Sequence, residues 1–348
     1  MPETLLEQTT IVDSIGERLI LATQAAALAA KHWIGMAEHT EISSNIAMVK
    51  NSADKAAVDA IYLALGNCPE FSATVVMGEG DKDEAPMLAH GDILGTNLDR
   101  KFDLAVDPID GTTFVAKNKP GGISVIAIAS PDSFPKWQGV HYAKKLIVGP
   151  NVKELMQNGK ISIDRDPLEN MKRIACHLGK YTNELVIVAL DRPRNAAVIS
   201  AAHKIGAKLV LIAGGDVVPG LLTCEEDIID IVYSSGGWPE ADVTAAGVYT
   251  RGGDMQVMYD PQNEVETAIV KSIKMDGVVL GMNKLVGTGE VRFAMTAITR
   301  YLDHKVGRSA DFAKIFEPGS TFYGAIINDI PQYIQRHPAK EWLIDSTY

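Results

Sequence analysis

The segment 103-DLAVDPIDGT-112 decides how this chain of 348 residues is interpreted. It begins as a short apolar run, typical of a buried strand, and passes directly into Asp, Pro and Gly. Those residue types form tight turns, and a turn with no further role explains them. A ligand site also explains them, because Asp107 and Asp110 can point at one place and hard cations bind clustered carboxylate oxygens.

A second strand ends in the same way. The run Ala73–Met77 leads into 78-GEGD-81, and further acidic residues follow. Gathering several carboxylates is costly unless a cation neutralises them, so Glu79, between two glycines, is predicted to be a metal ligand. A solvated acidic loop is the alternative, and it suits Asp81 and Asp83 better. Ligand sites commonly lie at such strand ends in α/β sheets.

The N-terminal part of the chain has helical spacing. Apolar residues recur every three or four positions from Asp13 to about His39, and again after residue 56. The polar stretch between the two helices predicts a loop that places Lys50 and Asp54 at or near a helix N-terminus. These two side chains are four residues apart and share a helix face, so a surface ion pair explains them equally well.

Further strands are predicted at residues 123–129, 185–190, 208–212 and 228–233. In the second half they alternate with helical segments, which favours a more parallel sheet covered on both faces. The last fifty residues are interpreted as a helical packing element. We therefore expect an N-terminal half, residues 1–150, with most metal ligands, and a C-terminal half, residues 151–348, with the substrate-binding residues.

Several basic and polar positions suit a phosphate. Arg192 and Arg194 follow a predicted strand, and guanidinium groups bind phosphate oxygens in a bidentate manner. Lys144 and Lys145 follow Tyr142, whose hydroxyl could donate to a sugar or phosphate. Solvated surface charge is the competing explanation for these cations.

Two glycine pairs precede predicted helix starts. The segment 214-GGD-216 could expose a helix N-terminus to an anion. The segment 236-GGWPE-240 places Glu240 in the first turn of a helix, where its carboxylate could bind a metal or simply cap the helix.

Composition excludes some functions. The formal charge of −11 repels phosphate backbones, so nucleic acid is not an expected partner. The three cysteines form no C-x-x-C pair, and neither a signal peptide nor a membrane span is predicted. We expect a cytoplasmic protein with no membrane partner.

In chain order the motifs KNSADKAAV, GEGDKDEAPML, DLAVDPIDGTT, YAKKLIVGP, DRPR, GGD and GGWPEADVTAA resemble the class II fructose 1,6-bisphosphatases, the glycerol-regulon type of bacterial phosphatase. The resemblance covers residues 15–300, and wider relatives are the lithium-sensitive sugar phosphatases. It implies the α/β sugar-phosphatase fold, layered α/β/α/β/α, with Mg²⁺ or Mn²⁺ as cofactor. A homo-oligomer, dimer or tetramer, is expected on the same ground.

The resemblance also implies roles for residues. Metal ligands would be Asp54, Glu79, Asp107, Asp110 and Glu240. The catalytic centre would contain Lys50, Asp110 and Thr112, with Thr112 beside the attacking water. Substrate-binding positions would be Gly111, Thr112, Tyr142, Arg192, Arg194, Asp216, Gly237 and Glu240.

Four positions depart from the family pattern. Asp110 stands where Glu is usual, Gly214 replaces an Asp, Asn195 replaces a frequent His, and Trp238 replaces a small residue. The metal ligands are retained, so the sequence predicts an intact metal site beside an altered sugar site.

The leading hypothesis is metal-dependent hydrolysis of the 1-phosphate of fructose 1,6-bisphosphate. Sedoheptulose 1,7-bisphosphate, or an inositol-type monophosphate, would suit the same metals. A non-catalytic sugar-phosphate sensor is a third hypothesis, motivated by the departures at Gly214, Asn195 and Trp238.

Overall fold

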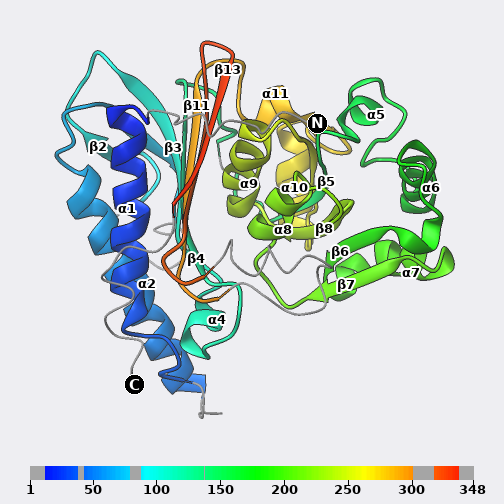
Figure 1. Ribbon diagram of the computed structural model, residues 1–348, viewed down its shortest axis with the longest axis horizontal. Coiled ribbons are helices and arrows are strands. Elements are labelled where there is room, and N and C mark those ends of the chain that lie inside the picture. Colours follow the sequence, from blue (N-terminus) through cyan, green and yellow to red (C-terminus); the bar gives the residue numbers. More distant parts are fainter. Residues whose placement is uncertain (1–11, 38–42, 79–87, 137, 301–316, 337–348) are drawn as a thin grey trace, which may run out of the picture.

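The chain forms two mixed β-sheets and a set of helices that cover and separate them (Figure 1). The structure is a computed structural model, and it describes residues 12–37, 43–78, 88–136, 138–300 and 317–336. The acidic segment that contains Glu79 lies outside these residues.

The first sheet has seven strands in the order β13-β12-β11-β4-β3-β1-β2. Only its β1–β3 pair is parallel, and the other neighbours are antiparallel. The strands are β1 (Ser72–Met77), β2 (Ile93–Gly95), β3 (Lys101–Asp110), β4 (Ile123–Ala129), β11 (Val291–Ala297), β12 (Thr321–Ile327) and β13 (Ile330–Arg336).

The second sheet has six strands in the order β10-β9-β5-β8-β6-β7. Strand β6 runs parallel to both β7 and β8, whereas β5 is antiparallel to β8 and β9, so the parallel sheet expected here is only partly parallel. The strands are β5 (Tyr142–Val148), β6 (Val186–Leu190), β7 (Lys208–Ile212), β8 (Ile231–Gly237), β9 (Asp254–Tyr259) and β10 (Leu280–Gly281).

Helices occupy three layers around these sheets. Helices α1 (Ser14–Lys31) and α2 (Ser43–Leu65) cover the outer face of the seven-stranded sheet. Between the sheets lie α8 (Val217–Leu222), α9 (Pro239–Thr250), α10 (Glu264–Ser272) and α11 (Met282–Leu285). The outer layer on the second sheet contains α6 (Pro167–His177) and α7 (Ala196–Lys204), and α4 (Thr112–Ala116) and α5 (Lys153–Gln157) are short connections. The predicted α/β/α/β/α layering is therefore confirmed.

Apolar patterning explains these layers. On α1 the buried residues include Ile15, Leu19, Ala22 and Ala26, which recur at helical spacing on the face toward the sheet. The helix begins where the Asp13 carboxylate accepts a hydrogen bond from the Gly16 backbone, an N-cap that satisfies one of its first amides.

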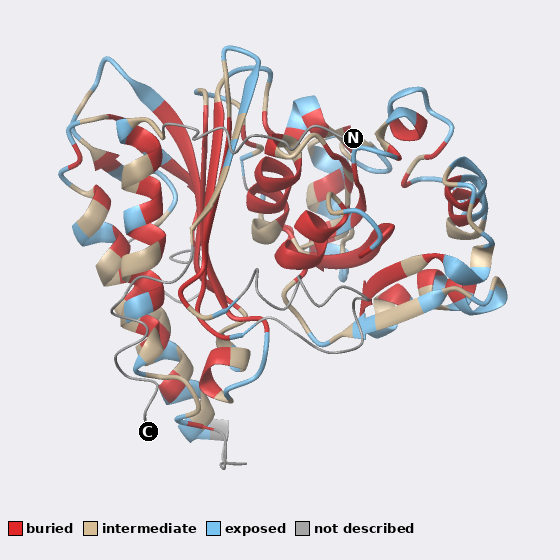
Figure 2. Ribbon diagram, in the orientation of Figure 1, coloured by how far each residue is buried: buried red, intermediate tan, exposed pale blue. Residues whose placement is uncertain are grey.

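Helix α9 is buried on nearly all sides (Figure 2). It is rich in alanine and packs against both β3 and β9, from opposite sheets. At Gly247 an added methyl would lie 3.0 Å from the Phe293 ring, so the close approach needs a residue without a side chain. A helix that is buried on nearly all sides belongs in the centre of a protein, and α9, mostly apolar after its acidic first turn, takes that place here.

Three sequence expectations need correction. Lys50 and Asp54 lie within α2, which begins at Ser43, so they are not at a helix N-terminus. The described part of the last fifty residues forms the β12–β13 hairpin and not a helix, because it pairs with β11 across a long sequence separation. Residues 103–110 form one continuous strand, and the predicted turn begins only at Gly111.

Sheet membership does not follow the predicted division near residue 150. Strand β5, before that point, belongs to the second sheet, and β11 to β13, far after it, belong to the first. The two-part domain assignment itself stays a prediction. Within the described residues, no helix combines the length and apolarity that crossing a bilayer requires.

Candidate active site

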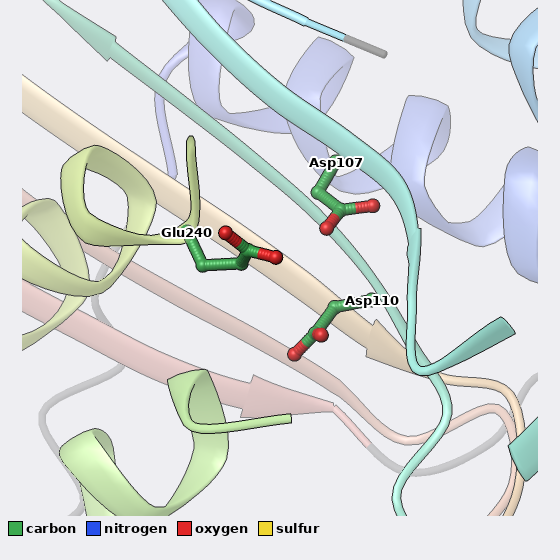
Figure 3. A group of neighbouring side chains, drawn as sticks. All are labelled: Asp107, Asp110 and Glu240. Carbon is green, nitrogen blue, oxygen red and sulfur yellow. The ribbon is translucent and has the colours of Figure 1, made fainter. Parts of the chain in front are cut away.

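Asp107, Asp110 and Glu240 converge between the two sheets (Figure 3). Each offers one carboxylate oxygen, and these three oxygens lie within 4.8 Å of one another. Asp107 and Asp110 are only 8% and 6% exposed. Three acidic groups this close and this buried repel one another, so their charges favour a bound cation.

The two aspartates reach this site because β3 is irregular. In a regular strand, residues three apart point to opposite faces of the sheet. Here the pairing of β3 with β4 shifts register between Asp107 and Asp110, as in a β-bulge, and re-aims the side chains. The Asp107 carboxylate also accepts a hydrogen bond from the Ile109 backbone at 3.1 Å, which fixes its direction.

Gly111 and Thr112 follow directly. Gly111 has a φ of +84°, a left-handed conformation that disfavours other residues, and an added methyl there would lie 3.0 Å from the Gly121 carbonyl oxygen. Thr112 begins α4, and its hydroxyl donates to the Ile109 carbonyl at 3.3 Å. The glycine thus turns the chain from the end of β3 directly into α4, which Thr112 begins.

Glu240 comes from the opposite side, in the first turn of α9 after Pro239. The expected proline at the helix start is confirmed. A carboxylate there is favoured by the helix dipole. At Gly237 an added methyl would overlap the Glu240 carboxylate, so a larger residue there would displace this side chain from its present position.

The donor set fits a hard divalent cation. All three groups are carboxylates, and Mg²⁺ and Mn²⁺ favour oxygen ligands. Asp54 is half-buried on α2, a helix that packs against β3, but it is not one of the three clustered acids. Lys50, one turn earlier on α2, is half-buried too. Glu79 lies outside the described residues.

Arg194 and Tyr142 contact each other where β5 begins and β8 ends. The Arg194 guanidinium lies 4.1 Å from the centre of the Tyr142 ring, a cation–π contact, and its Nε donates to the Ser235 carbonyl at 3.0 Å. Arg192 is exposed and donates to the Asp191 and Ala213 carbonyls. The two arginines therefore have different contacts. Arg194 is hydrogen-bonded to β8, whereas Arg192 connects its own loop to the turn after β7.

Two of the four residues that depart from the family pattern, Asn195 and Trp238, are buried and have contacts that hold the fold together. Asn195 is buried, accepts a hydrogen bond from the Ser235 backbone at 2.6 Å and donates to the Leu190 carbonyl at 3.0 Å. It thus joins the ends of β6 and β8. Trp238 is fully buried and stacks on Tyr259, with ring centres 4.2 Å apart. Gly214 has ordinary contact with the Phe114 ring and leaves room for a side chain.

Asp216 has a partner that sequence reasoning missed. Its carboxylate accepts hydrogen bonds from Lys145 at 2.9 Å and 3.0 Å, and the two side chains are 4% and 0% exposed. Lys145 was expected near a phosphate or in solvent. The alternation of β5 could have located it, because Lys145 shares a strand face with Ala143 and Ile147, which both face the central core.

Asp242 is a second buried acid near that pair. Both of its carboxylate oxygens lack a hydrogen-bond partner among the described residues. Burial raises the pKa of Asp242 well above its usual range, and the charge of Lys145 only partly opposes this shift. The shift favours the protonated form of Asp242, which avoids the cost of burying a charge.

Comparison with known proteins shows the family of this chain. The family model for bacterial fructose-1,6-bisphosphatase, glpX-encoded, matches residues 13–303. The class 2 fructose-1,6-bisphosphatase of Haemophilus influenzae is 41% identical over 246 residues, covering 70% of this chain and 68% of that protein. Fructose-1,6-bisphosphatase 1 class 2 of Escherichia coli is 34% identical over 293 residues, covering 80% of this chain and 82% of that protein. This chain belongs to the bacterial glpX-encoded fructose-1,6-bisphosphatase family.

Proposed function

We propose that this protein hydrolyses the 1-phosphate of fructose 1,6-bisphosphate, giving fructose 6-phosphate and phosphate. The observation that supports this most is the convergence of Asp107, Asp110 and Glu240 from two different layers, in a chain whose family has this activity in its name. With a divalent cation bound, such a site would attract a phosphate that the protein's own charge of −11 would otherwise repel.

We assign the bound metal as Mg²⁺ or Mn²⁺, held by the three clustered carboxylates with Asp54 and Glu79 as further ligands. When bound, such ions neutralise the charge of the transferring phosphoryl group and lower the pKa of water. The protein's own contribution is to hold the carboxylates in place, through the irregular strand β3 and the first turn of α9. Positioning and charge account for most of the rate in phosphoryl transfer.

The remaining residues orient the substrate. Thr112, two residues after Asp110 at the start of α4, would orient the attacking water, and Lys50 would add positive charge from α2. Arg194 and Arg192 would bind the phosphate that is not hydrolysed, with Tyr142 donating its hydroxyl. Asp216 and the backbone of Gly111 and Gly237 would shape the sugar pocket. We expect a cytoplasmic homo-oligomer.

The test is phosphate release from fructose 1,6-bisphosphate, measured with and without Mg²⁺ or Mn²⁺ after chelator treatment. We expect turnover only with the metal. Sedoheptulose 1,7-bisphosphate and an inositol monophosphate in the same assay identify the preferred substrate.

Asp107→Ala is the matched negative control and should abolish turnover, because it removes a ligand from the cluster. Equal kcat in wild type and Asp107→Ala would overturn the site. Tight binding of the bisphosphate with no metal-dependent turnover would overturn the enzyme assignment and favour a sensor.

A further inference from the structure

A lysine in the central core needs a reason. Lys145 is fully buried and lies on the face of β5 that also carries Ala143 and Ile147, which pack in the central apolar cluster. Taking a charge out of water costs several kcal/mol, and an apolar residue of similar size is often as stable or more stable there. Lys145 is thus a costly choice if its only role is packing.

Its ion pair reaches the turn that adjoins the metal ligands. Lys145 donates to both oxygens of Asp216, which directly precedes α8. One residue earlier, at Gly215, an added methyl would lie 3.6 Å from the Asp110 carboxylate and 3.5 Å from the Phe114 ring. The turn 213–216 therefore packs directly against the acidic cluster.

The other side of Asp216 is equally close-packed. An added methyl at Gly236 would lie 2.6 Å from the Asp216 carboxylate, and Gly236 is followed by Gly237, which makes room for Glu240. The Asp216 carboxylate is thus held between Lys145 and the end of β8. At its other end the turn is held by Arg192, which donates to the Ala213 carbonyl.

We propose that Lys145 is a positioning residue for the proposed reaction, on which this inference rests: its buried ion pair with Asp216 fixes the turn 213–216 against Asp110. The backbone and carboxylate of this turn then have one orientation before substrate arrives. A small misplacement of substrate-binding groups is costly to turnover, which explains why an ion pair is kept where an apolar pair would suffice.

The test compares Lys145→Met with a matched control, Lys180→Met. Lys180 forms an ion pair with Asp230 at 2.8 Å, and Asp230 is 6% exposed at its side chain. Asp230 directly precedes β8, whereas Gly237 ends that strand, so the control pair lies roughly 20 Å from the site along the strand. Each substitution removes the lysine partner of a buried aspartate that lies next to a strand of the second sheet.

We expect both variants to lose stability, with Tm falling by roughly 5 °C. Only Lys145→Met should raise KM, by about tenfold, with a smaller fall in kcat, because the metal ligands lie outside the turn. Lys180→Met should keep the KM and kcat of the wild type. A KM for Lys145→Met within twofold of wild type would overturn the proposal and leave Lys145 a purely structural residue.

A second measurement does not depend on the substrate. Hydrogen exchange of peptides that contain residues 213–222 should become faster in Lys145→Met and remain unchanged in Lys180→Met. Unchanged exchange in both would overturn the positioning role whatever the substrate is, whereas a wild type inactive on fructose 1,6-bisphosphate overturns only the proposed function. If Lys145→Met fails to fold, Lys145→Gln, which keeps a donor without the charge, gives the same two readouts.

Discussion

At the scale of single residues, Arg194 contributes a shaped group and not only a charge. Its guanidinium lies over the Tyr142 ring while its Nε donates to the Ser235 carbonyl. A lysine ammonium can do neither in the same geometry, because it lacks the planar fork. Together these contacts hold the guanidinium in one place, and in the function proposed above its remaining hydrogens would bind a phosphate.

Arg194→Lys is therefore expected to raise KM about tenfold, equivalent to about 1.4 kcal/mol, with kcat changed less than twofold. The charge is retained, so a loss of this size reflects shape. Steady-state kinetics at saturating metal measure it. Arg173→Lys is the control, since Arg173 is exposed on α6 and should leave both constants unchanged. A KM equal to the wild-type value in Arg194→Lys would contradict the role.

Residue identity was easier to predict than residue environment. The sequence indicated Asp107, Asp110 and Glu240 as ligands, and the structure brings these three together. It did not reveal the register shift in β3, because a bulge depends on the partner strand β4. Lys145 was not assigned to the core although the alternation of β5 indicates it, whereas its partner Asp216 lies 71 residues away and could not be found from local sequence.

At the scale of elements, the start of α1 couples a helix cap to a buried charge. Asp13 accepts from the Gly16 backbone and pairs with Arg292 of β11, which is fully buried. Burial raises the pKa of Asp13, but the hydrogen bonds from Arg292 and Gly16 outweigh it, and the pKa lies below the usual 3.8. The carboxylate thus joins α1 to the seven-stranded sheet.

Two substitutions separate these contributions. Asp13→Asn keeps a good cap and loses the charge, so it should lower the free energy of unfolding by about 1 kcal/mol, since the Asp13 side chain is 38% exposed. Asp13→Ala loses both and should cost about 1 kcal/mol more. Urea unfolding at about pH 6 measures both values.

The contribution of the Asp13 carboxylate to stability should change with pH in a definite direction. A carboxylate with a lowered native pKa contributes stability that is complete above its unfolded pKa and disappears as pH falls through the native value. The difference between wild type and Asp13→Asn should therefore be constant above about pH 5 and shrink as pH falls from about 5 to 3. A difference that stays constant over this range would show that the ion pair does not stabilise the fold.

Elements formed by local patterns were predicted well, and those formed by distant pairing were not. Strands β4 and β7 have the bounds that the sequence indicated, because each is a short apolar run between breakers. Strands β12 and β13 were taken for a helix. Their position is determined by β11, which pairs with both β12 and β4 and so brings the C-terminal part of the chain into the first sheet.

At the scale of the whole molecule, the site joins two layers. Asp107 and Asp110 belong to the seven-stranded sheet, whereas Glu240 belongs to α9, which packs between the sheets. Without a cation the three carboxylates repel one another across this boundary. A bound cation would reverse that repulsion and hold the sheet and the helix together.

Metal binding should therefore stabilise the fold as well as support turnover. After chelator treatment, adding Mg²⁺ or Mn²⁺ at a hundredfold excess over its Kd should raise Tm by roughly 4 °C. Asp107→Asn combined with Glu240→Gln removes two charges from the cluster, so the repulsion and the cation's effect should both disappear. This double variant is expected to have a higher Tm than metal-free wild type and almost no response to metal. Calorimetry of both proteins, with and without the ion, decides between the outcomes. An equal rise in Tm for the two proteins would show that the ion binds elsewhere, and the three carboxylates would then need another explanation.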